Sequence, residues 1–232
     1  MNLFYQPRIP EGIHYLDEEE SRHCTRVLRR KPGDLIRITD GKGYFYDAVI
    51  TDAGQRQCGF GIRETISVPE RTYPIHIAVS PTKNADRIEW FIEKSVEIGI
   101  ERITLLSCAH TERTFIKPER LMKVAISAMK QSLKARLPVI DPVTSFSDVL
   151  SQADSVDRYI AWVDPENPRH LKDAAQKGRP ALVLIGPEGD FSADEQKDAV
   201  YHGFQKVSLG TSRLRTETAA LVACHILNLI NS

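Results

Sequence analysis

The chain has 232 residues, of which 41% are hydrophobic and 27% are charged, enough for one large core or two unequal ones. Its 31 basic and 31 acidic residues leave no net charge at pH 7, so contact with RNA would need a local basic patch. The N-terminus shows no basic leader, and the most apolar run, residues 218–230, is too short to span a bilayer, so we expect a cytoplasmic protein without membrane contact. Four scattered cysteines and seven unclustered histidines predict neither a disulfide framework nor a metal site.

The only dense basic patch lies in EEESRHCTRVLRRKPGD, residues 18–34. Its arginines recur at helical spacing, which predicts a helix that carries them on one face. They are Arg22, Arg26, Arg29 and Arg30. Two interpretations remain open. In the first, the acidic residues before the patch and the basic residues at its end complement a helix dipole. In the second, the arginines bind RNA phosphates.

A change of character falls in SVPERTYP, residues 67–74, where two prolines separate two kinds of pattern. Before it, alternating runs in residues 34–50 with Gly-containing turns predict the hairpins of a small barrel. After it, strands and helices alternate, which predicts an α/β domain with a mostly parallel sheet. We therefore expect a first domain at residues 1–72 and a second at residues 73–232.

The second domain contains five expected strands, four helical patterns between them and one last helix. Strands are predicted at 74–80, 102–107, 158–164, 181–186 and 206–210, and helices at 86–99, 118–135, 146–153, 193–203 and from Thr216 onward. The last helix is apolar on almost every side, which predicts that it is buried.

Two loops follow the fourth and fifth strands of this domain, IGPEGDFS and LGTSRLRTETAA. Ser192 and Glu195 form a capping box after the first loop, and Thr216 can cap the last helix after the second. If the two strands are adjacent and parallel, both loops lie at the same edge of the sheet, where α/β proteins bind ligands. Both loops contain glycine and neither contains lysine, which argues against a triphosphate ligand.

These motifs resemble the paired C-terminal motifs of the ribosomal RNA small subunit methyltransferase E family, which belongs to the knotted SPOUT methyltransferases. Residues 83–103, 111–114 and 130–140 are similar to further family segments in the same order, and residues 23–43 resemble the family's PUA-like barrel. The resemblance implies an α/β fold, a SPOUT-type knotted parallel-sheet methyltransferase domain preceded by a small PUA-like β-barrel domain.

Three departures from the family pattern stand out. The family usually has Gly at Asp190, an acidic residue at Lys130, and Gly-Arg at Leu133-Lys134. The first should only adjust a turn. The other two weaken the expectation that this segment contacts RNA, although Lys130, Lys134 and Arg136 keep it basic.

The resemblance implies transfer of a methyl group from S-adenosylmethionine to the uracil nitrogen between two carbonyls in small-subunit ribosomal RNA, free or in a 30S particle. It also implies a homodimer through the C-terminal domain. By resemblance, the cofactor-binding residues are Leu184, Gly186, Pro187, Glu188, Gly189, Leu209, Gly210, Ser212, Leu214 and Thr218. The cofactor's carboxylate is expected near the start of the last helix.

Removing a proton from uracil places negative charge on the flanking carbonyl oxygens, which a guanidinium can stabilise. Arg215 is the first candidate for this role and Arg113 the second. Glu217 or Glu188 could accept the proton or bind a cofactor hydroxyl, and the sequence does not decide between these roles. Two other classes stay open: a non-catalytic RNA-binding assembly protein, which would retain no cofactor, and a magnesium-dependent hydrolase or phosphotransferase.

Overall fold

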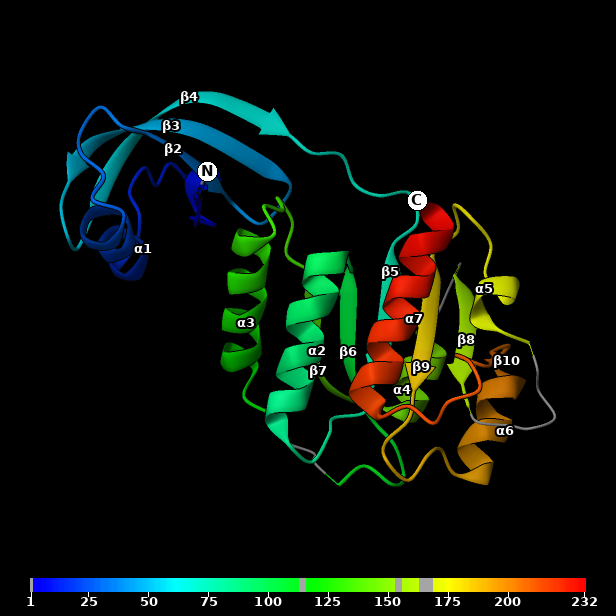
Figure 1. Cartoon of the computed structure of the whole chain (residues 1–232). Coiled ribbons are helices and arrows are strands. Elements are labelled where there is room, and N and C mark those ends of the chain that lie inside the picture. The colour runs from blue at the N-terminus through cyan, green and yellow to red at the C-terminus, as the bar shows by residue number, and fades with distance from the viewer. Residues whose placement is uncertain (1, 113–115, 153–155, 163–168) are drawn as a thin grey trace. The chain divides into compact units, whose positions relative to one another are not determined.

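The computed structural model describes residues 2–112, 116–152, 156–162 and 169–232. Within these ranges the chain forms two compact units, residues 1–70 with 126–137 and residues 71–125 with 138–232 (Figure 1). The sequence did not signal that residues 126–137 belong with the first unit. The domain boundary after residue 72 stays a prediction. No helix in the described ranges is long and apolar enough to cross a membrane.

The first unit is built on a sheet whose described strands pair in chain order. They are β1 (Leu3–Tyr5), β2 (Leu35–Thr39), β3 (Tyr44–Ala53) and β4 (Cys58–Ser67). β1 runs parallel to β2, and the other two pairings are antiparallel, which confirms the predicted hairpins. Alternate residues of these strands point to one face, and their apolar side chains form the core of this unit together with Leu16 and Cys24.

The helix that carries the arginines is shorter than expected. α1 (Glu18–Arg22), capped by the Asp17 carboxylate, continues into a π-helical turn over His23–Val27. Arg29 has a left-handed φ of 54°, so it and Arg30 lie beyond the helix. The prediction that all four arginines share one helical face is therefore wrong, because the backbone turns before the last two.

The second unit contains a parallel sheet whose described strands lie in the order β10-β8-β9-β5-β6-β7. They are β5 (Ile75–Val79), β6 (Arg102–Ser107), β7 (Val139–Ser145), β8 (Asp157–Ala161), β9 (Ala181–Ile185) and β10 (Gln205–Val207). The condition that the fourth and fifth expected strands be adjacent is not met, since β8 lies between β9 and β10. Their carboxyl ends still share one edge, because every pairing in this sheet is parallel. β7 was missed, because this edge strand contains Pro142 and has no apolar run.

Helices cover both faces of this sheet. They are α2 (Ala85–Ile98), α4 (Phe146–Ser151), α5 (Leu171–Ala174), α6 (Ala193–Tyr201) and α7 (Thr216–Asn231), with residues 118–125 of α3 (Pro118–Gln131), whose remaining residues belong to the first unit. α2 and α7 run side by side, and α7 also contacts β5 and β9 (Figure 1). The prediction that α7 is buried all round is wrong. Its buried side chains recur at Ala220, Ala223, Cys224 and Leu227, which is one face, whereas Leu229 is 63% exposed.

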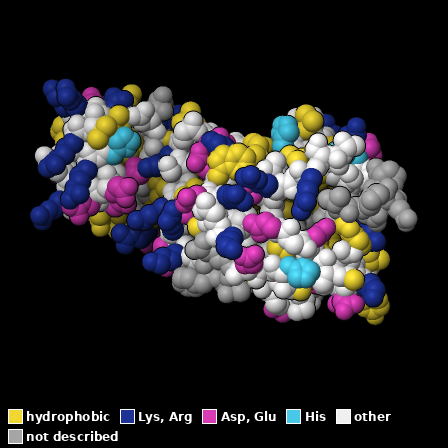
Figure 2. All heavy atoms as spheres, turned by 60° about the horizontal axis from the view of Figure 1, so that its bottom comes forward, with side chains coloured by type: hydrophobic (Ala, Val, Ile, Leu, Met, Phe, Trp, Pro, Cys, Tyr) yellow, Lys and Arg dark blue, Asp and Glu magenta, His cyan; other side chains and the backbone are white. Residues whose placement is uncertain are grey.

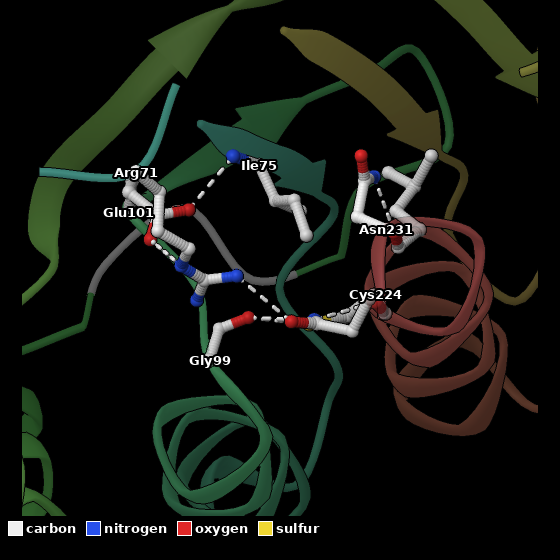
Figure 3. A network of polar contacts seen from close by, with 8 residues as sticks. Arg71, Ile75, Gly99, Glu101, Cys224 and Asn231 are labelled. Carbon is white, nitrogen blue, oxygen red and sulfur yellow. Dashed lines mark hydrogen bonds and ion pairs between the residues drawn. The ribbon is translucent and has the colours of Figure 1, made fainter. Parts of the chain in front are cut away.

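A polar network fixes the end of α7 to the end of α2 (Figure 3). Arg71 Nε lies 2.7 Å from Glu101 Oε1, and Arg71 Nη1 donates to Asn228 Oδ1 at 2.8 Å. Asn228 Nδ2 in turn donates to the carbonyl oxygen of Gly99 at 2.8 Å. Gly99 has a φ of 123°, and a Cβ there would lie 2.2 Å from Arg71 Nη2. This junction therefore requires glycine.

Two departures from the family pattern fall on left-handed backbone, Asp190 at φ 62° and Leu133 at φ 53°. Such a conformation costs a non-glycine residue about 1–2 kcal/mol. Aspartate tolerates it better because its short carboxylate can bond locally, and Asp190 Oδ1 accepts a hydrogen bond from Phe191 N at 2.8 Å. Leu133 is 54% exposed, so packing offsets little of the cost.

We predict that Leu133→Gly raises the free energy of unfolding by about 0.5–1 kcal/mol, because relief of the left-handed strain exceeds the extra entropy of glycine. Leu35 is a matched control, since it is equally exposed at 54% but lies in strand β2. Leu35→Gly should lower the free energy of unfolding by about 0.5–1 kcal/mol. Urea unfolding measures both. Equal destabilisation by the two substitutions would contradict the strain at Leu133.

Candidate active site at the carboxyl edge of the parallel sheet

Three loops leave the carboxyl ends of the neighbouring strands β9, β5 and β6. They span residues 186–192, 80–84 and 108–111. This edge is where open α/β sheets bind ligands. The loops are connected by hydrogen bonds, so they form one assembly rather than three independent segments.

Ser80 lies at the centre of this assembly and is fully buried. Its backbone N donates to Ile185 O at 3.0 Å, and its Oγ lies 2.8 Å from Thr111 Oγ1. Thr111 Oγ1 also accepts from Cys108 N at 2.8 Å. Thr111 therefore has a positioning role inside the TERT motif that sequence reasoning did not assign.

Glu195 joins the loop after β9 to the loop after β6. The predicted capping box is confirmed, with Ser192 N donating to Glu195 Oε2 at 2.8 Å. The other carboxylate oxygen, Oε1, accepts from Ala109 N at 2.7 Å. The capping motif identified Glu195 from the sequence, but its second partner is remote in the chain and no sequence signal revealed it.

His110 packs against the glycine-bearing loop. Its Nδ1 lies 3.0 Å from the carbonyl oxygen of Asp190. A Cβ at Gly189 would lie 3.3 Å from His110 Cβ, so a larger residue would displace one of the two. The backbone from Pro187 to Asp190 forms a turn, closed by a 3.0 Å hydrogen bond from Asp190 N to Pro187 O. His110 was not predicted, although it directly precedes TERT.

The start of α7 connects to the same loop. Thr216 does not cap the helix as predicted, because it already has helical backbone and its hydroxyl donates to Gly186 O at 3.1 Å. Arg215 is the N-cap residue, and no described side chain accepts from the first amides of α7. In contrast, Asn84 caps α2 and Ser192 caps α6. The amino end of α7 is therefore available to an anion.

A pocket of about 340 Å³ opens between the start of α7 and α2. It is lined by Asp86, Arg87, Trp90, Arg215, Glu217 and Thr218. Glu217 is only 7% exposed, and its Oε1 lies 3.9 Å from Arg87 Nε. Its Oε2 is buried and finds no hydrogen-bond partner among the described residues. The structure thus brings Arg215, Glu217 and Thr218 together.

The remaining predicted residues are more dispersed. Leu184 is fully buried in the core between the sheet and helices α4 and α6, so only its backbone can face a ligand. Gly210 has a φ of 124° in an exposed loop, and nothing in the described ranges lies within 4 Å of a Cβ there. Ser212 is exposed, and Leu209 and Leu214 are half-buried. Arg113 lies outside the described residues.

The arginines of the first unit make separate contacts. Arg22 pairs with Glu18, and Arg26 Nε donates to Gln55 Oε1 at 3.0 Å. Arg22, Arg26 and Arg29 are exposed, whereas Arg30 is half-buried. Figure 2 shows Lys and Arg side chains interspersed with Asp and Glu on the face that it displays.

The sequence profile of the RNA methyltransferase domain matches residues 69–228, and that of the RNA methyltransferase PUA domain matches residues 16–58. Ribosomal RNA small subunit methyltransferase E of Rickettsia conorii is 26% identical, over 99% of this chain and 96% of the relative. The chain belongs to the ribosomal RNA small subunit methyltransferase E family.

Solved structures agree over the full length. A crystal structure described as a probable rRNA-methyltransferase from Porphyromonas gingivalis is 44% identical, with a TM-score of 0.95 over 100% of this chain and 98% of that one. Ribosomal RNA small subunit methyltransferase E from Neisseria gonorrhoeae, solved with bound S-adenosyl methionine, is 26% identical, with a TM-score of 0.85 over the same shares. The PUA-like unit and the SPOUT-type parallel-sheet unit are thus those of the methyltransferase E family.

In this family member, the segment around residue 130 is occupied by contacts within the first unit. Lys130 forms an ion pair with Glu20, whose side chain is 7% exposed. The Arg136 guanidinium donates to Lys42 O at 2.8 Å and to Val68 O at 2.9 Å. Lys130 and Arg136 therefore hold residues 126–137 against the first unit's own residues. Their positive charges do not by themselves indicate RNA contact.

We predict that Lys130→Met lowers the free energy of unfolding by about 3 kcal/mol near pH 7, because it leaves a buried carboxylate unpaired. Burial already raises the pKa of Glu20, opposed by its hydrogen bond to Lys130. The folded state therefore binds this proton more tightly than the unfolded state, so stability falls as pH rises from the unfolded pKa through the raised folded pKa. Without Lys130 the pKa rises further and this fall steepens.

Urea unfolding at pH 4 and pH 7 measures this effect. The loss should be smaller at pH 4, where glutamate is largely protonated in both states. Adding Glu20→Gln to Lys130→Met should flatten the pH dependence and recover part of the stability. A pH-independent loss in Lys130→Met would show that Glu20 is not the group responsible.

We predict that Glu195→Gln loosens the connection between the loops after β9 and β6, because an amide group cannot accept from both Ser192 N and Ala109 N. Leaving one backbone donor unpaired costs about 1–3 kcal/mol. Hydrogen exchange should show faster exchange at the Ala109 amide. Glu188→Gln, at an exposed position of the same loop, is the control. Unchanged protection of Ala109 in Glu195→Gln would contradict the bridge.

Proposed function

We propose that this protein transfers the methyl group of S-adenosylmethionine to N3 of a uridine in small-subunit ribosomal RNA. The observation that carries the proposal is the glycine-bearing loop after β9, tied by Thr216 to the uncapped start of α7 at the ligand-binding edge of the sheet. Membership of the family and the cofactor bound to the Neisseria relative support the same reaction.

The described residues fit this cofactor. Its adenosine part carries no charge and needs close approach to backbone groups, which Gly210 permits, because no described residue lies within 4 Å of a Cβ there. Its carboxylate suits the amino end of α7, where the first amides lack a side-chain acceptor. The proposed contacts are those of Gly186, Pro187, Glu188, Gly189, Leu209, Gly210, Ser212, Leu214 and Thr218, with the backbone of Leu184.

Arg215 is the proposed stabiliser of negative charge on the uracil carbonyl. It is exposed at the pocket beside α7, so its guanidinium is free to reach a bound base. A planar guanidinium presents two parallel donors to an oxygen-bearing group, and such preorganised donors lower barriers in sites where anions form. Arg113 is the second candidate. Glu217 suits proton transfer less well, because it is buried beside Arg87.

The first unit is proposed to dock the RNA. Exposed Arg22, Arg26 and Arg29 suit phosphate contacts, with Arg30 at the edge of the patch. Such contacts position a nucleic acid without reading its sequence. These arginines therefore do not select the target by themselves, whether it is free RNA or an assembled 30S particle.

A homodimer through the second unit is part of the proposal. One face of α7 packs inside this unit, while apolar side chains remain on its other faces, including the 63% exposed Leu229. Trp90 on the neighbouring α2 is 42% exposed. A second copy of the chain would cover these side chains. After β10 the chain returns across the sheet as α7, which packs beside β5 and α2. The family's trefoil knot would form in this returning segment.

The reaction is tested by incubating the protein with S-adenosylmethionine that carries a labelled methyl group and with small-subunit RNA, free or in 30S particles. The RNA is then digested, and its nucleosides are separated and identified by mass spectrometry. The expected product is 3-methyluridine. Label in another base or on ribose would retain the methyltransferase assignment and reject the proposed nitrogen.

We predict that Arg215→Lys lowers the single-turnover rate of methyl transfer on the order of a hundredfold, as removal of one preorganised donor does elsewhere. Cofactor affinity should stay unchanged, because the guanidinium is directed at the base. Calorimetric titration with S-adenosylmethionine measures this affinity, and Arg213→Lys on the same exposed loop is the control. If affinity weakens as much as the rate falls, Arg215 binds the cofactor, and Arg113 becomes the better candidate.

A further inference from the structure

We propose that His110 is the general base that takes the proton from uracil N3. This inference rests on the proposed function and supplies the proton acceptor that the reaction needs. His110 lies on the loop after β6 and contacts the loop after β9, so it borders the proposed cofactor loop directly. Its side chain is exposed, which leaves the ring accessible to a substrate base.

The backbone on both sides of His110 is anchored. Ala109 N donates to Glu195 Oε1 at 2.7 Å on one side. On the other side, Thr111 Oγ1 accepts from Cys108 N and lies 2.8 Å from Ser80 Oγ. The imidazole therefore extends from a fixed segment of backbone, and catalytic groups need such fixed placement.

The contact with Asp190 determines which ring nitrogen can act as a base. Nδ1 of His110 lies 3.0 Å from the Asp190 carbonyl oxygen, which has lone pairs but no hydrogen. Nδ1 must therefore carry a hydrogen and donate a hydrogen bond to this oxygen. In a neutral imidazole the other nitrogen, Nε2, then holds the free lone pair. His110 is thus held in the tautomer whose Nε2 accepts a proton.

The nearby carboxylates are less suited to this role. Both oxygens of Glu195 accept backbone N–H groups, and Glu217 is buried beside Arg87. Glu188 is exposed, but a carboxylate is intrinsically a weaker base than imidazole, with reference pKa values of about 4.3 and 6.5. An imidazole also matches proton transfer near neutral pH best.

The step balances as follows. The N3–H bond of uracil breaks and its proton binds to His110 Nε2, while the electron pair stays on N3. N3 bonds to the methyl carbon as the carbon–sulfur bond of the sulfonium breaks, and that electron pair passes to sulfur, leaving a neutral thioether. The exposed imidazolium then releases its proton to water.

Three variants separate a base from a loop contact. His110→Asn keeps an N–H donor near the position of Nδ1 and removes Nε2. His110→Ala removes both ring nitrogens. His110→Gln is a second amide variant with a longer side chain. The single-turnover rate should fall at least a hundredfold in all three, within the usual effect of a general base. Calorimetry should show the same S-adenosylmethionine affinity in His110→Asn as in the native protein. Added imidazole should restore part of the rate in His110→Ala.

A measurement without turnover completes the test. Long-range ¹H–¹⁵N correlation spectra of the ¹⁵N-labelled protein should show His110 in the Nδ1–H tautomer. An Nε2–H tautomer, or a native rate in His110→Asn, would overturn the proposal and reduce His110 to a loop contact. If the native protein binds S-adenosylmethionine but forms no 3-methyluridine, the proposed function fails first and the assignment of His110 fails with it.

Discussion

The position of β9 between β5 and β8 is the constraint on which the candidate site depends. Its five residues are all buried, and parallel pairing on both sides fixes where it ends. The position of the loop that follows β9 is therefore fixed. Two hydrogen bonds hold its start, one from Ser80 N to Ile185 O and one from the Thr216 hydroxyl to Gly186 O. Glu195 then extends the same assembly to the loop after β6. The sheet therefore places the loops, and the side chains of Thr216 and Glu195 connect them through hydrogen bonds to backbone groups.

Much of this architecture followed from local pattern. Apolar runs bounded by glycine and proline located β5, β6, β8 and β9, and the S-x-x-E motif located the start of α6. Strand order did not follow, because nothing in the residues of β10 indicates that β8 separates it from β9. The arginine helix was overestimated, since the left-handed turn at Arg29 has no glycine to announce it. Both errors concern features that the hydrophobic periodicity of a sequence does not determine, namely the pairing of strands far apart in the chain and left-handed backbone conformations.

The same limit applies to the site. The glycine-bearing loops and the start of α7 were recognisable as motifs, and Arg215, Glu217 and Thr218 do meet in one pocket. The assembly of Ser80, Thr111 and Glu195 was not recognisable, because each hydrogen bond joins residues far apart in the chain. Charge was also misleading as a guide to RNA contact. Lys130 balances a buried glutamate, and Arg136 binds backbone carbonyls, so basic residues in this segment serve the fold.

The central claim is that the loops after β9 and β10, with the start of α7, form the S-adenosylmethionine site. Amide hydrogen exchange, measured with and without saturating S-adenosylmethionine, tests it most directly. Slower exchange in residues 186–190 and 209–218, with little change in β2 and β3 of the first unit, is the predicted result. Protection confined to other segments, for example the pocket of the second unit between α3 and β7 that Leu121 and Val143 line, would contradict the claim.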